Sequence, residues 1–437
     1  MEKNILHLKA PGNWVNDPNG FLFYKGNYHL FYQHFPYAPR WGTMHWGHAV
    51  SKDLVHWEHK GIALFPTKRE DQNGCFSGSA VEHDGKMHIF YTGVRYEVPD
   101  PEDIHVCVND RFESSQLMIT SEDGMHFDNF HDKKVIIPAI TDKKVGDRTH
   151  TRDPKVWRGK DAWYMVLGSK SEESGKLLFY RSENLSDWTY MNQTTTSEKL
   201  GWMWECPDYF ETENGQVLVF SPMGIMEDGM VHENHTLCTG VEFEEKTCSM
   251  NISDSYQFLD YGLDLYAPQS TVDADGNRVL VAWLRMPEAV EGKWNGMFCM
   301  PRVVEVKNGH IYFRLHPNVK KAFCKKIETT AQAARDGYCI SMELKEGASI
   351  SVGGYRITRE NGKILTDRSN VFPELKEYRM KFETPEVKEG FHLDIYAEKN
   401  MMEVYVNDGE YVISNAVYDL GEDIETEERY TLFTVKR

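Results

Sequence analysis

An apolar segment that recurs through roughly the first 300 residues limits what this chain can fold into. Its copies come roughly every 55 to 75 residues, each just after a Gly, Asn or Asp turn of the kind that joins hairpin strands. The copies are YHLFYQ from Tyr28, MHIFYTG from Met87, AWYMVLGS from Ala162, QVLVFSP from Gln216 and RVLVAWLR from Arg278. Five copies predict five similar units.

A second short strand precedes each turn, so every unit begins with a hairpin. These preceding segments are GFLFY, SGSAVEH, PKVWR, PDYFE and PQSTVD. Three units continue with a polar turn and an outer strand, from Ser51, Ser121 and Ser182. A β-sandwich has no reason to repeat one hairpin order five times, whereas each blade of a β-propeller is one such small sheet. The repeat therefore favours a five-bladed β-propeller.

From about residue 310 the repeat gives way to strands of alternating polarity, such as SISVGGYRIT, FHLDIYAE and MEVYVND. This alternation is typical of a β-sandwich, whose strands bury one face and expose the other. We therefore predict an all-β chain. A propeller catalytic domain is expected over residues 1–305, followed by a short linker and a C-terminal β-sandwich domain over residues 306–437.

Charge and cysteine usage narrow the class of protein. The formal net charge of −18 repels phosphate backbones and anionic membranes. No segment approaches the roughly 20 apolar residues that span a bilayer, and the N-terminus lacks a signal-peptide core. Eight cysteines lie without CxxC pairs, which favours free thiols over zinc sites or disulfides. We expect a cytoplasmic monomer or homodimer without metal or cofactor, and with no nucleic-acid or membrane partner.

Three acidic residues stand at the entrance of a unit's first strand. They are Asp17 in WVNDPNG, Asp153 in RDPKVW and Glu205 in WECPDYF. Asp before Pro is a common turn former, so Asp17 or Asp153 alone would more often be a turn residue. First strands line the channel of a propeller, however, and the same place in three units would bring the acids to one pocket. We predict a turn at WVNDPNG that presents Asp17 to that pocket.

Carboxylates in an aromatic-rich pocket without a metal-ligand cluster point to glycoside hydrolysis. Glu205 lies between a Trp and a Cys, in apolar surroundings that would raise its pKa and suit a proton donor. Asp17 lies among turn amides and beside Asn16, donors that suit an ionised nucleophile. Arg152 would keep Asp153 anionic and offer donors to sugar hydroxyls. The expected partner is a small-molecule sugar.

The segments WVNDPNG, RDPKVW and WECPDYF, in this order and spacing, resemble the three signatures of the β-fructofuranosidases of glycoside hydrolase family 32. The likeness continues through residues 41–57, 75–81, 260–270 and 403–410. The resemblance implies a propeller with a β-sandwich and a retaining double displacement. Asp17 would form a covalent fructosyl-enzyme, Glu205 would act as acid and then base, and Asp153 would hold fructose hydroxyls.

The resemblance also implies a fructose subsite. Its residues would be Asn16, Gln33, Trp41, Phe76, Ser77, Arg152, Tyr266 and Trp283. Taken alone, Trp41 and Trp283 are equally compatible with core packing.

Two segments depart from the family pattern, the long acidic stretch at residues 95–115 and YQHFP at residues 32–36. Loops around a pocket select its ligand, so both departures bear on the leaving group. Sucrose, sucrose 6-phosphate and short fructo-oligosaccharides all remain open as substrates of an exo-acting enzyme. A phosphorylated sugar would need cations, for which the candidates are Arg40, Lys68, Arg69, Arg95, Arg111, Lys143, Lys144 and Arg148.

Two other functions use the same residues. A fructosyltransferase would pass the fructosyl group to a sugar instead of water, and product analysis at high sucrose would separate the two. A catalytically inactive carbohydrate-binding propeller would turn over no fructoside at all. The presence of all three acids weighs against the inactive propeller, whereas the sequence does not separate the hydrolase from the transferase.

Overall fold

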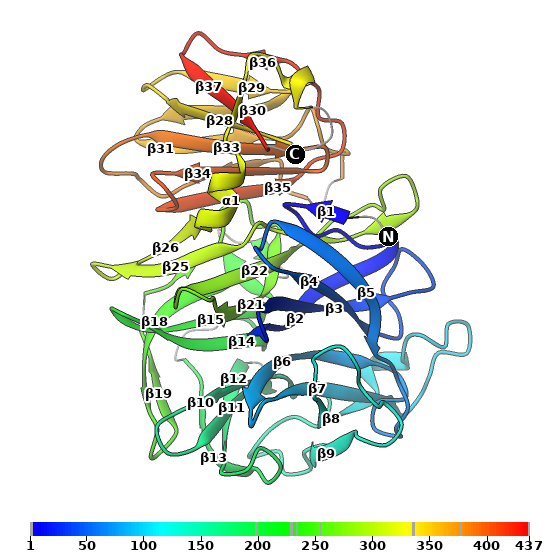
Figure 1. Cartoon of the computed structure of the whole chain (residues 1–437). Helices are drawn as coiled ribbons and strands as arrows, with labels where there is room; N and C mark the ends of the chain where they lie inside the picture. The colour runs from blue at the N-terminus through cyan, green and yellow to red at the C-terminus, as the bar shows by residue number, and fades with distance from the viewer. Residues whose placement is uncertain are drawn as a thin grey trace.

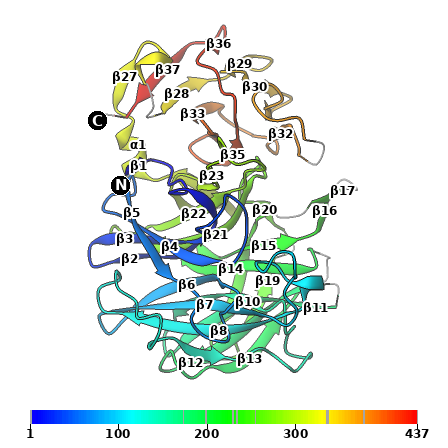
Figure 2. The same ribbon diagram turned by 90° about the vertical axis from the view of Figure 1, so that its right-hand side faces the viewer.

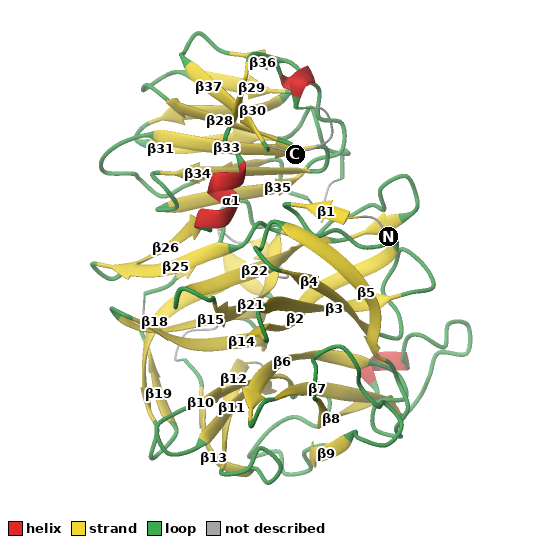
Figure 3. Ribbon diagram, in the orientation of Figure 1, coloured by secondary structure: helices red, strands yellow, loops and turns green. Residues whose placement is uncertain are grey.

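The computed structural model describes residues 3–172, 174–196, 200–227, 230–232, 235–253, 255–333, 337–375 and 378–435. Nearly all regular structure in these ranges is β-strand (Figure 3). The one α-helix of the described residues, α1 (Pro317–Ala322), lies between a larger and a smaller group of sheets (Figure 1). Short 3-10 turns occur at Val108–Asp110 and Thr330–Gln332. No helix in the described part is long and apolar enough to cross a membrane.

Five antiparallel sheets form the larger group. The first contains β2 (Asn13–Tyr24), β3 (Asn27–Phe35), β4 (His45–Ser51) and β5 (His56–Leu64), with β1 (Lys3–Ile5) on β5 and β23 (Trp294–Asn295) on β2. The second contains β6 (Cys75–His83), β7 (Lys86–Tyr96), β8 (Phe112–Ser121) and β9 (Lys134–Ile137). The third contains β10 (Arg152–Arg158), β11 (Trp163–Ser171), β12 (Ser174–Ser182) and β13 (Thr189–Thr194).

The last two sheets follow the same order with small additions. The fourth contains β14 (Met203–Thr212), β15 (Gly215–Met223), β18 (Leu237–Glu244) and β19 (Ser249–Ile252), with β20 (Gln257–Phe258) on β18. The fifth contains β21 (Leu265–Val272), β22 (Arg278–Leu284), β25 (Arg302–Lys307) and β26 (His310–Leu315), with β24 (Met297–Phe298) on β22. The hairpin of β16 (Ile225–Glu227) and β17 (Met230–His232) projects at the edge of Figure 2.

The first strands of these sheets form a closed ring. Strands β2, β6, β10, β14 and β21 contact one another in that order, and β21 contacts β2 in turn. Apolar side chains fill the space between neighbouring sheets, as where Phe31 and Trp46 of the first pack with Ile89 and Tyr91 of the second. The prediction of a five-bladed β-propeller is confirmed, and each recurring segment is the second strand of its blade.

The smaller group is a two-layered β-sandwich, as predicted. One sheet contains β27 (Lys325–Ile327), β37 (Tyr430–Thr434), β28 (Tyr338–Glu343), β33 (His392–Glu398), β34 (Met401–Val406) and β35 (Tyr411–Ala416). The other contains β32 (Lys381–Glu383), β31 (Lys363–Asp367), β30 (Tyr355–Glu360), β29 (Ser349–Val352) and β36 (Ile424–Glu425). The predicted boundary at residues 305/306 falls inside β25, which pairs with β22 and β26 in the fifth blade. We propose that the propeller continues through Leu315.

Buried ion pairs join the two domains at the loop that leads into β21. Arg302 is fully buried, and its Nη1 and Nη2 bind Asp260 Oδ2 at 2.9 Å and Glu403 Oε2 at 2.8 Å. Arg368 of the sandwich pairs with Asp264, the residue just before β21. Breaking one member of a buried pair leaves an uncompensated charge, so such contacts fix the relative position of the domains.

His7 makes a similar buried contact, and its pKa links domain packing to pH. Its ring nitrogens lie 3.0 Å from Glu398 and 2.8 Å from Glu403, both in the sandwich. Burial alone would lower the pKa of His7, but the two carboxylates outweigh it and raise the pKa from 6.5 to about 9. Protonated His7 thus stabilises the fold fully below pH 6.5, and this contribution fades as the pH rises through 9.

We expect His7→Gln to lower the free energy of unfolding by about 3 kcal/mol at pH 6, because the shift of the pKa corresponds to roughly that energy. Near pH 9.5 the difference from the wild type should largely vanish. Urea unfolding at both pH values measures it. His126 pairs with Asp123 on the surface, so His126→Gln is the control and should change stability little at either pH. A pH-independent loss in His7→Gln would contradict the linkage.

Candidate active site

A β-bulge interrupts the first strand of every blade at one end of the ring. Strand pairing shifts between Val15 and Pro18, Cys75 and Gly78, Arg152 and Lys155, Glu205 and Asp208, and Tyr266 and Gln269. A bulge bends its strand and re-aims the side chains next to it. The turn predicted at WVNDPNG is wrong, because this segment lies inside β2 and forms the first of these bulges.

The third and fourth blades align residue by residue at their bulges. Asp153 and Cys206 both have left-handed φ angles, of 65° and 48°, and both precede a proline. Glu205 stands one residue earlier and therefore corresponds to Arg152, not to Asp153. The prediction that the three acids share one place in the repeat is thus wrong for Glu205. Its own place in the bulge puts it against Arg152 of the neighbouring blade.

A cavity of about 500 Å³ opens over the five bulges. All eleven predicted site residues line it, namely Asp17, Asp153, Glu205, Asn16, Gln33, Trp41, Phe76, Ser77, Arg152, Tyr266 and Trp283. Nine residues that the sequence did not single out line it too, namely Tyr96, Val106, Cys107, Asp110, Phe112, His150, Trp202, Met223 and Arg285.

Part of this missed set carried a signal in the sequence. Five of the nine come from residues 96–112, the stretch that the sequence marked as unusually long. His150 and Arg285 lie just beyond the ends of β10 and β22, so strand alternation would not have identified them. For Trp202 and Met223 we find no such signal.

Asp17 is held by side chains from three blades. Ser77 donates a short hydrogen bond to Oδ2, and Asn16 Nδ2 donates to Oδ1 at 3.1 Å. The sequence suggested the Asn16 donor, whereas Ser77 takes the place of the turn amides that it also suggested. Burial raises the pKa of Asp17, and the Ser77 hydrogen bond opposes that rise while the charge of Glu205 adds to it. Asp17 is therefore a fixed carboxylate with a second carboxylate nearby.

Asp153 is the most enclosed of the three acids. Its Oδ2 accepts a hydrogen bond from the Cys206 amide at 2.9 Å. The Cys206 sulfur lies 3.6 Å from Oδ2 of both Asp153 and Asp17, and burial keeps the pKa of this thiol well above its usual value. Burial also raises the pKa of Asp153, against the opposing charge of Arg152. The charge of Arg152 lowers the pKa of Asp153, as predicted, but burial outweighs this effect, and the guanidinium itself pairs with Glu205.

The guanidinium of Arg152 binds Glu205. Arg152 Nη2 and Nε donate to Glu205 Oε1 at 2.6 and 3.1 Å, and the Tyr266 hydroxyl donates to Oε2 at 2.5 Å. The apolar surroundings predicted for Glu205 are therefore wrong, since both oxygens meet polar partners. The Glu205 side chain keeps 18% of its surface exposed, so it can reach a ligand in the cavity.

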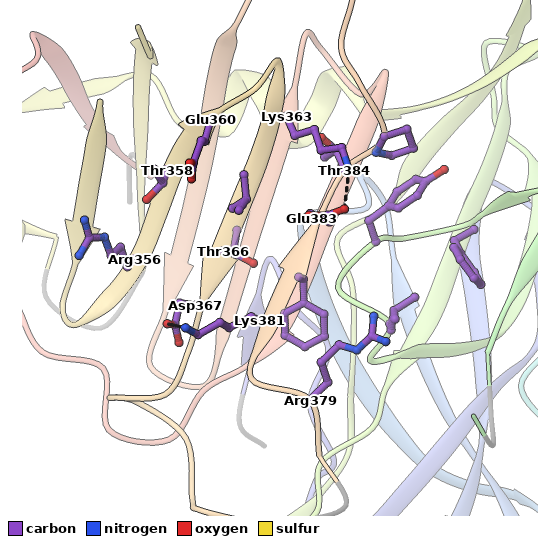
Figure 4. Close-up of a pocket in the computed structure, with 16 residues that line it drawn as sticks. Arg356, Thr358, Glu360, Lys363, Thr366, Asp367, Arg379, Lys381, Glu383 and Thr384 are labelled. Atoms are coloured by element: carbon purple, nitrogen blue, oxygen red, sulfur yellow. Dashed lines mark hydrogen bonds and ion pairs between the residues drawn. The ribbon is translucent and has the colours of Figure 1, made fainter. Parts of the chain in front are cut away.

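A larger cavity of about 770 Å³ lies on the sandwich, over the face of β30, β31 and β32 (Figure 4). Its charged side chains come largely as cross-strand pairs, such as Lys363 with Glu383 at 2.6 Å and Lys381 with Asp367 at 3.5 Å. Such pairs suit a solvated sheet face. None of the predicted site residues lines this cavity.

Two family models match this chain, one over the propeller and one over the sandwich. The model of the glycosyl hydrolases family 32 N-terminal domain matches residues 7–317, and that of the family 32 C-terminal domain matches residues 320–435. A raffinose invertase of Escherichia coli is 33% identical, with 95% of this chain and 89% of that protein covered. A sucrose-6-phosphate hydrolase of Escherichia coli is also 33% identical, with 96% and 90% covered.

Solved structures share the fold over nearly the whole chain. A family 32 β-fructofuranosidase of Bombyx mori is 26% identical and superposes with a TM-score of 0.85, covering 99% of this chain and 93% of that one. An Asp-to-Ala variant of the same enzyme in complex with sucrose superposes with a TM-score of 0.81 over the same shares.

Proposed function

This chain belongs to glycosyl hydrolase family 32 and is a β-fructofuranosidase, and from that premise we propose how its three carboxylates share the reaction. Asp17 attacks the anomeric carbon of a terminal non-reducing β-D-fructofuranoside, while Glu205 protonates the leaving oxygen. A covalent fructosyl-Asp17 ester forms and the leaving sugar departs. Glu205 then takes a proton from water, which attacks the same carbon and releases fructose with its configuration retained.

One observation carries this division of roles, namely the different partners of Asp17 and Glu205. Asp17 accepts hydrogen bonds from Ser77 and Asn16 that hold its carboxylate in one orientation, as a nucleophile requires. The Glu205 side chain keeps 18% of its surface exposed, and the Arg152 and Tyr266 contacts fix it beside the cavity without closing it off. An acid that must exchange protons with water needs such access.

Asp153 takes the third role, holding fructose hydroxyls and stabilising the positive charge that develops on the sugar ring. Its amide is fixed by Thr92 Oγ1 at 3.0 Å and its Oδ2 by the Cys206 amide. These contacts leave Oδ1 without a hydrogen-bond partner among the described residues, so it can accept sugar hydroxyls. The substrates that fit are sucrose, sucrose 6-phosphate and short fructo-oligosaccharides.

The anomer released first tests this mechanism. We expect the purified protein to release fructose from sucrose, with β-fructofuranose appearing before any other form in rapid NMR spectra, because two displacements restore the starting configuration. An α-anomer formed first would contradict the covalent intermediate.

At high sucrose concentration, free fructose should exceed fructosyl-sucrose products; the reverse ratio would make the chain a transferase. No turnover on any fructoside would make it a sugar-binding propeller.

A further inference from the structure

The loop between β7 and β8, residues 97–111, forms the outer wall of the active-site cavity. Val106, Cys107 and Asp110 of this loop line the cavity, and Tyr96 and Phe112 line it at the ends of the two strands. They share the cavity with the three acids. Because the acids engage the fructose in the proposed function, we place the leaving sugar against this wall.

The 97–111 loop is an ordered hairpin fixed to the first blade. Within it, the Asp100 amide donates to the Val106 carbonyl at 3.0 Å. Across to the first blade, Thr43 Oγ1 and His105 Nδ1 lie 2.9 Å apart. Within the second blade, the His105 carbonyl accepts a hydrogen bond from the Tyr96 hydroxyl at 2.8 Å. The side chains that this loop presents to the cavity are therefore set in place before a ligand binds.

Arginines around the 97–111 loop are already paired with carboxylates. They include four of the cations that the sequence offered as phosphate ligands, in the pairs Arg40–Asp103 (3.0 Å), Arg95–Glu113 (2.6 Å), Arg111–Glu97 (3.7 Å) and Arg148 with Glu97 and Glu113. Arg95 also lowers the pKa of Glu113, which keeps this acid ionised. None of the four arginines lines the cavity. A phosphate would have to compete with these carboxylates for each of them.

Two arginines do line the cavity, and both lie on the side of Glu205 and its partner Tyr266. Arg152 is bound to Glu205. Arg285 lies over the Tyr266 ring at 5.8 Å and donates from Nη2 to the Leu263 carbonyl at 2.7 Å. Their positive charge thus lies beside the acid that protonates the leaving oxygen.

The outer side keeps a single carboxylate, that of Asp110. Within the described ranges this carboxylate makes no ion pair and no hydrogen bond, although it lines the cavity. His150 faces it from the third blade, and burial together with Arg152 lowers the pKa of His150 to about 4, so the ring is neutral at pH 7. Phe112, His150 and Trp202 form a chain of edge-on rings at 5.9 and 5.2 Å.

Resting on the proposed function, we infer that the outer half of this cavity is built for an uncharged leaving sugar, whose hydroxyl donates a hydrogen bond to Asp110. A phosphate group beside Asp110 would meet an anionic carboxylate, while the four arginines around the loop are paired with carboxylates and Arg285 lies at Tyr266 instead. Aromatic rings and a carboxylate acceptor suit a neutral hexose, whose C–H groups pack on a ring face and whose hydroxyls donate hydrogen bonds. The preferred substrates are therefore sucrose and sucrose-ended oligosaccharides, with sucrose 6-phosphate disfavoured.

The test compares kcat/KM for sucrose and sucrose 6-phosphate at pH 7 and fixed salt. We expect the wild type to favour sucrose by about tenfold or more, because the carboxylate repels a dianion at close range. Asp110→Asn should narrow that ratio by about threefold or more, since it removes the charge but keeps the shape. Glu102→Gln removes the same charge from an exposed position of the same loop, and should leave the ratio within about twofold.

Two results would overturn the inference while leaving the proposed function intact. One is a kcat/KM for sucrose 6-phosphate equal to or above that for sucrose. The other is an Asp110→Asn variant that changes the ratio no more than Glu102→Gln does. If neither sugar nor an aryl β-fructofuranoside is cleaved, the proposed function itself fails, and the two failures are thereby distinguished.

Discussion

Replacing Asp17 by Asn should lower kcat on sucrose by about 10⁴-fold or more while the protein stays folded. The amide has nearly the shape of the carboxylate and can still accept the hydrogen bond from Ser77. It cannot form the ester to fructose, so no alternative route of similar rate remains. Initial rates on sucrose, together with the thermal unfolding midpoint, measure both parts of this expectation.

The control for Asp17→Asn is Asp84→Asn, on an exposed turn between β6 and β7. This variant removes the same charge far from the cavity and should keep wild-type kcat. Turnover by Asp17→Asn within tenfold of the wild type would show that Asp17 is not the nucleophile. A large drop in its unfolding midpoint would instead point to a structural role for the Ser77 contact.

The Glu205→Gln variant should lose about 10³-fold in kcat on sucrose, whose leaving group needs a proton. On an aryl fructoside with an acidic phenol the first step needs little protonation, so the loss there should be smaller. The second step, the attack of water, still lacks its base because Gln cannot take a proton from water. The fructosyl ester should therefore accumulate. Mass spectrometry of the quenched variant should find one fructosyl group on the peptide that contains Asp17.

Glu211→Gln serves as the control for Glu205→Gln, since Glu211 is exposed near the far end of the same strand β14. It should behave as the wild type on both substrates. Equal losses by Glu205→Gln on sucrose and on the aryl fructoside would remove the proton-donor role. An adduct on any other peptide would count against Asp17 as well.

The architecture could be predicted from the sequence because the repeat is local. Each hairpin carries its own turn residues and its own apolar strand, so the five blades and the change to a sandwich are visible without knowledge of long-range pairing. Eight of the eleven candidate site residues lie on the first strands, which the fold brings to one cavity, whereas Gln33 and Trp283 lie on second strands and Trp41 in a loop. The family resemblance, rather than the repeat, identified the binding residues among them.

What the sequence could not provide is strand register. Pro, Asn, Asp and Gly favour turns and bulges alike, so WVNDPNG reads as a turn although its pairing partners place it inside β2. The one-residue offset of Glu205 has the same origin. The partner of Arg152 also depends on how adjacent blades face each other, and sequence proximity wrongly favoured Asp153 over Glu205.

The 97–111 loop was visible as an unusual segment, but not as the wall of the cavity. Its acidic and basic residues could equally have formed a phosphate site, and only their pairing in space decides between these uses. Arg95 and Arg148 meet at Glu113, although they are far apart in the sequence. The amino-acid composition does not show which charged side chains neutralise one another in space.

The domain junction has a consequence for any attempt to reduce this enzyme to a minimal module. Asp260 pairs with Arg302 of the propeller, and Asp264 pairs with Arg368 of the sandwich. Both aspartates belong to the loop that leads to Tyr266, the residue that binds Glu205. A propeller excised without the sandwich would lose Arg368 and leave Asp264 as an unpaired charge two residues before Tyr266. The sandwich is thus an inseparable part of the catalytic apparatus, and the two domains can be transplanted only together.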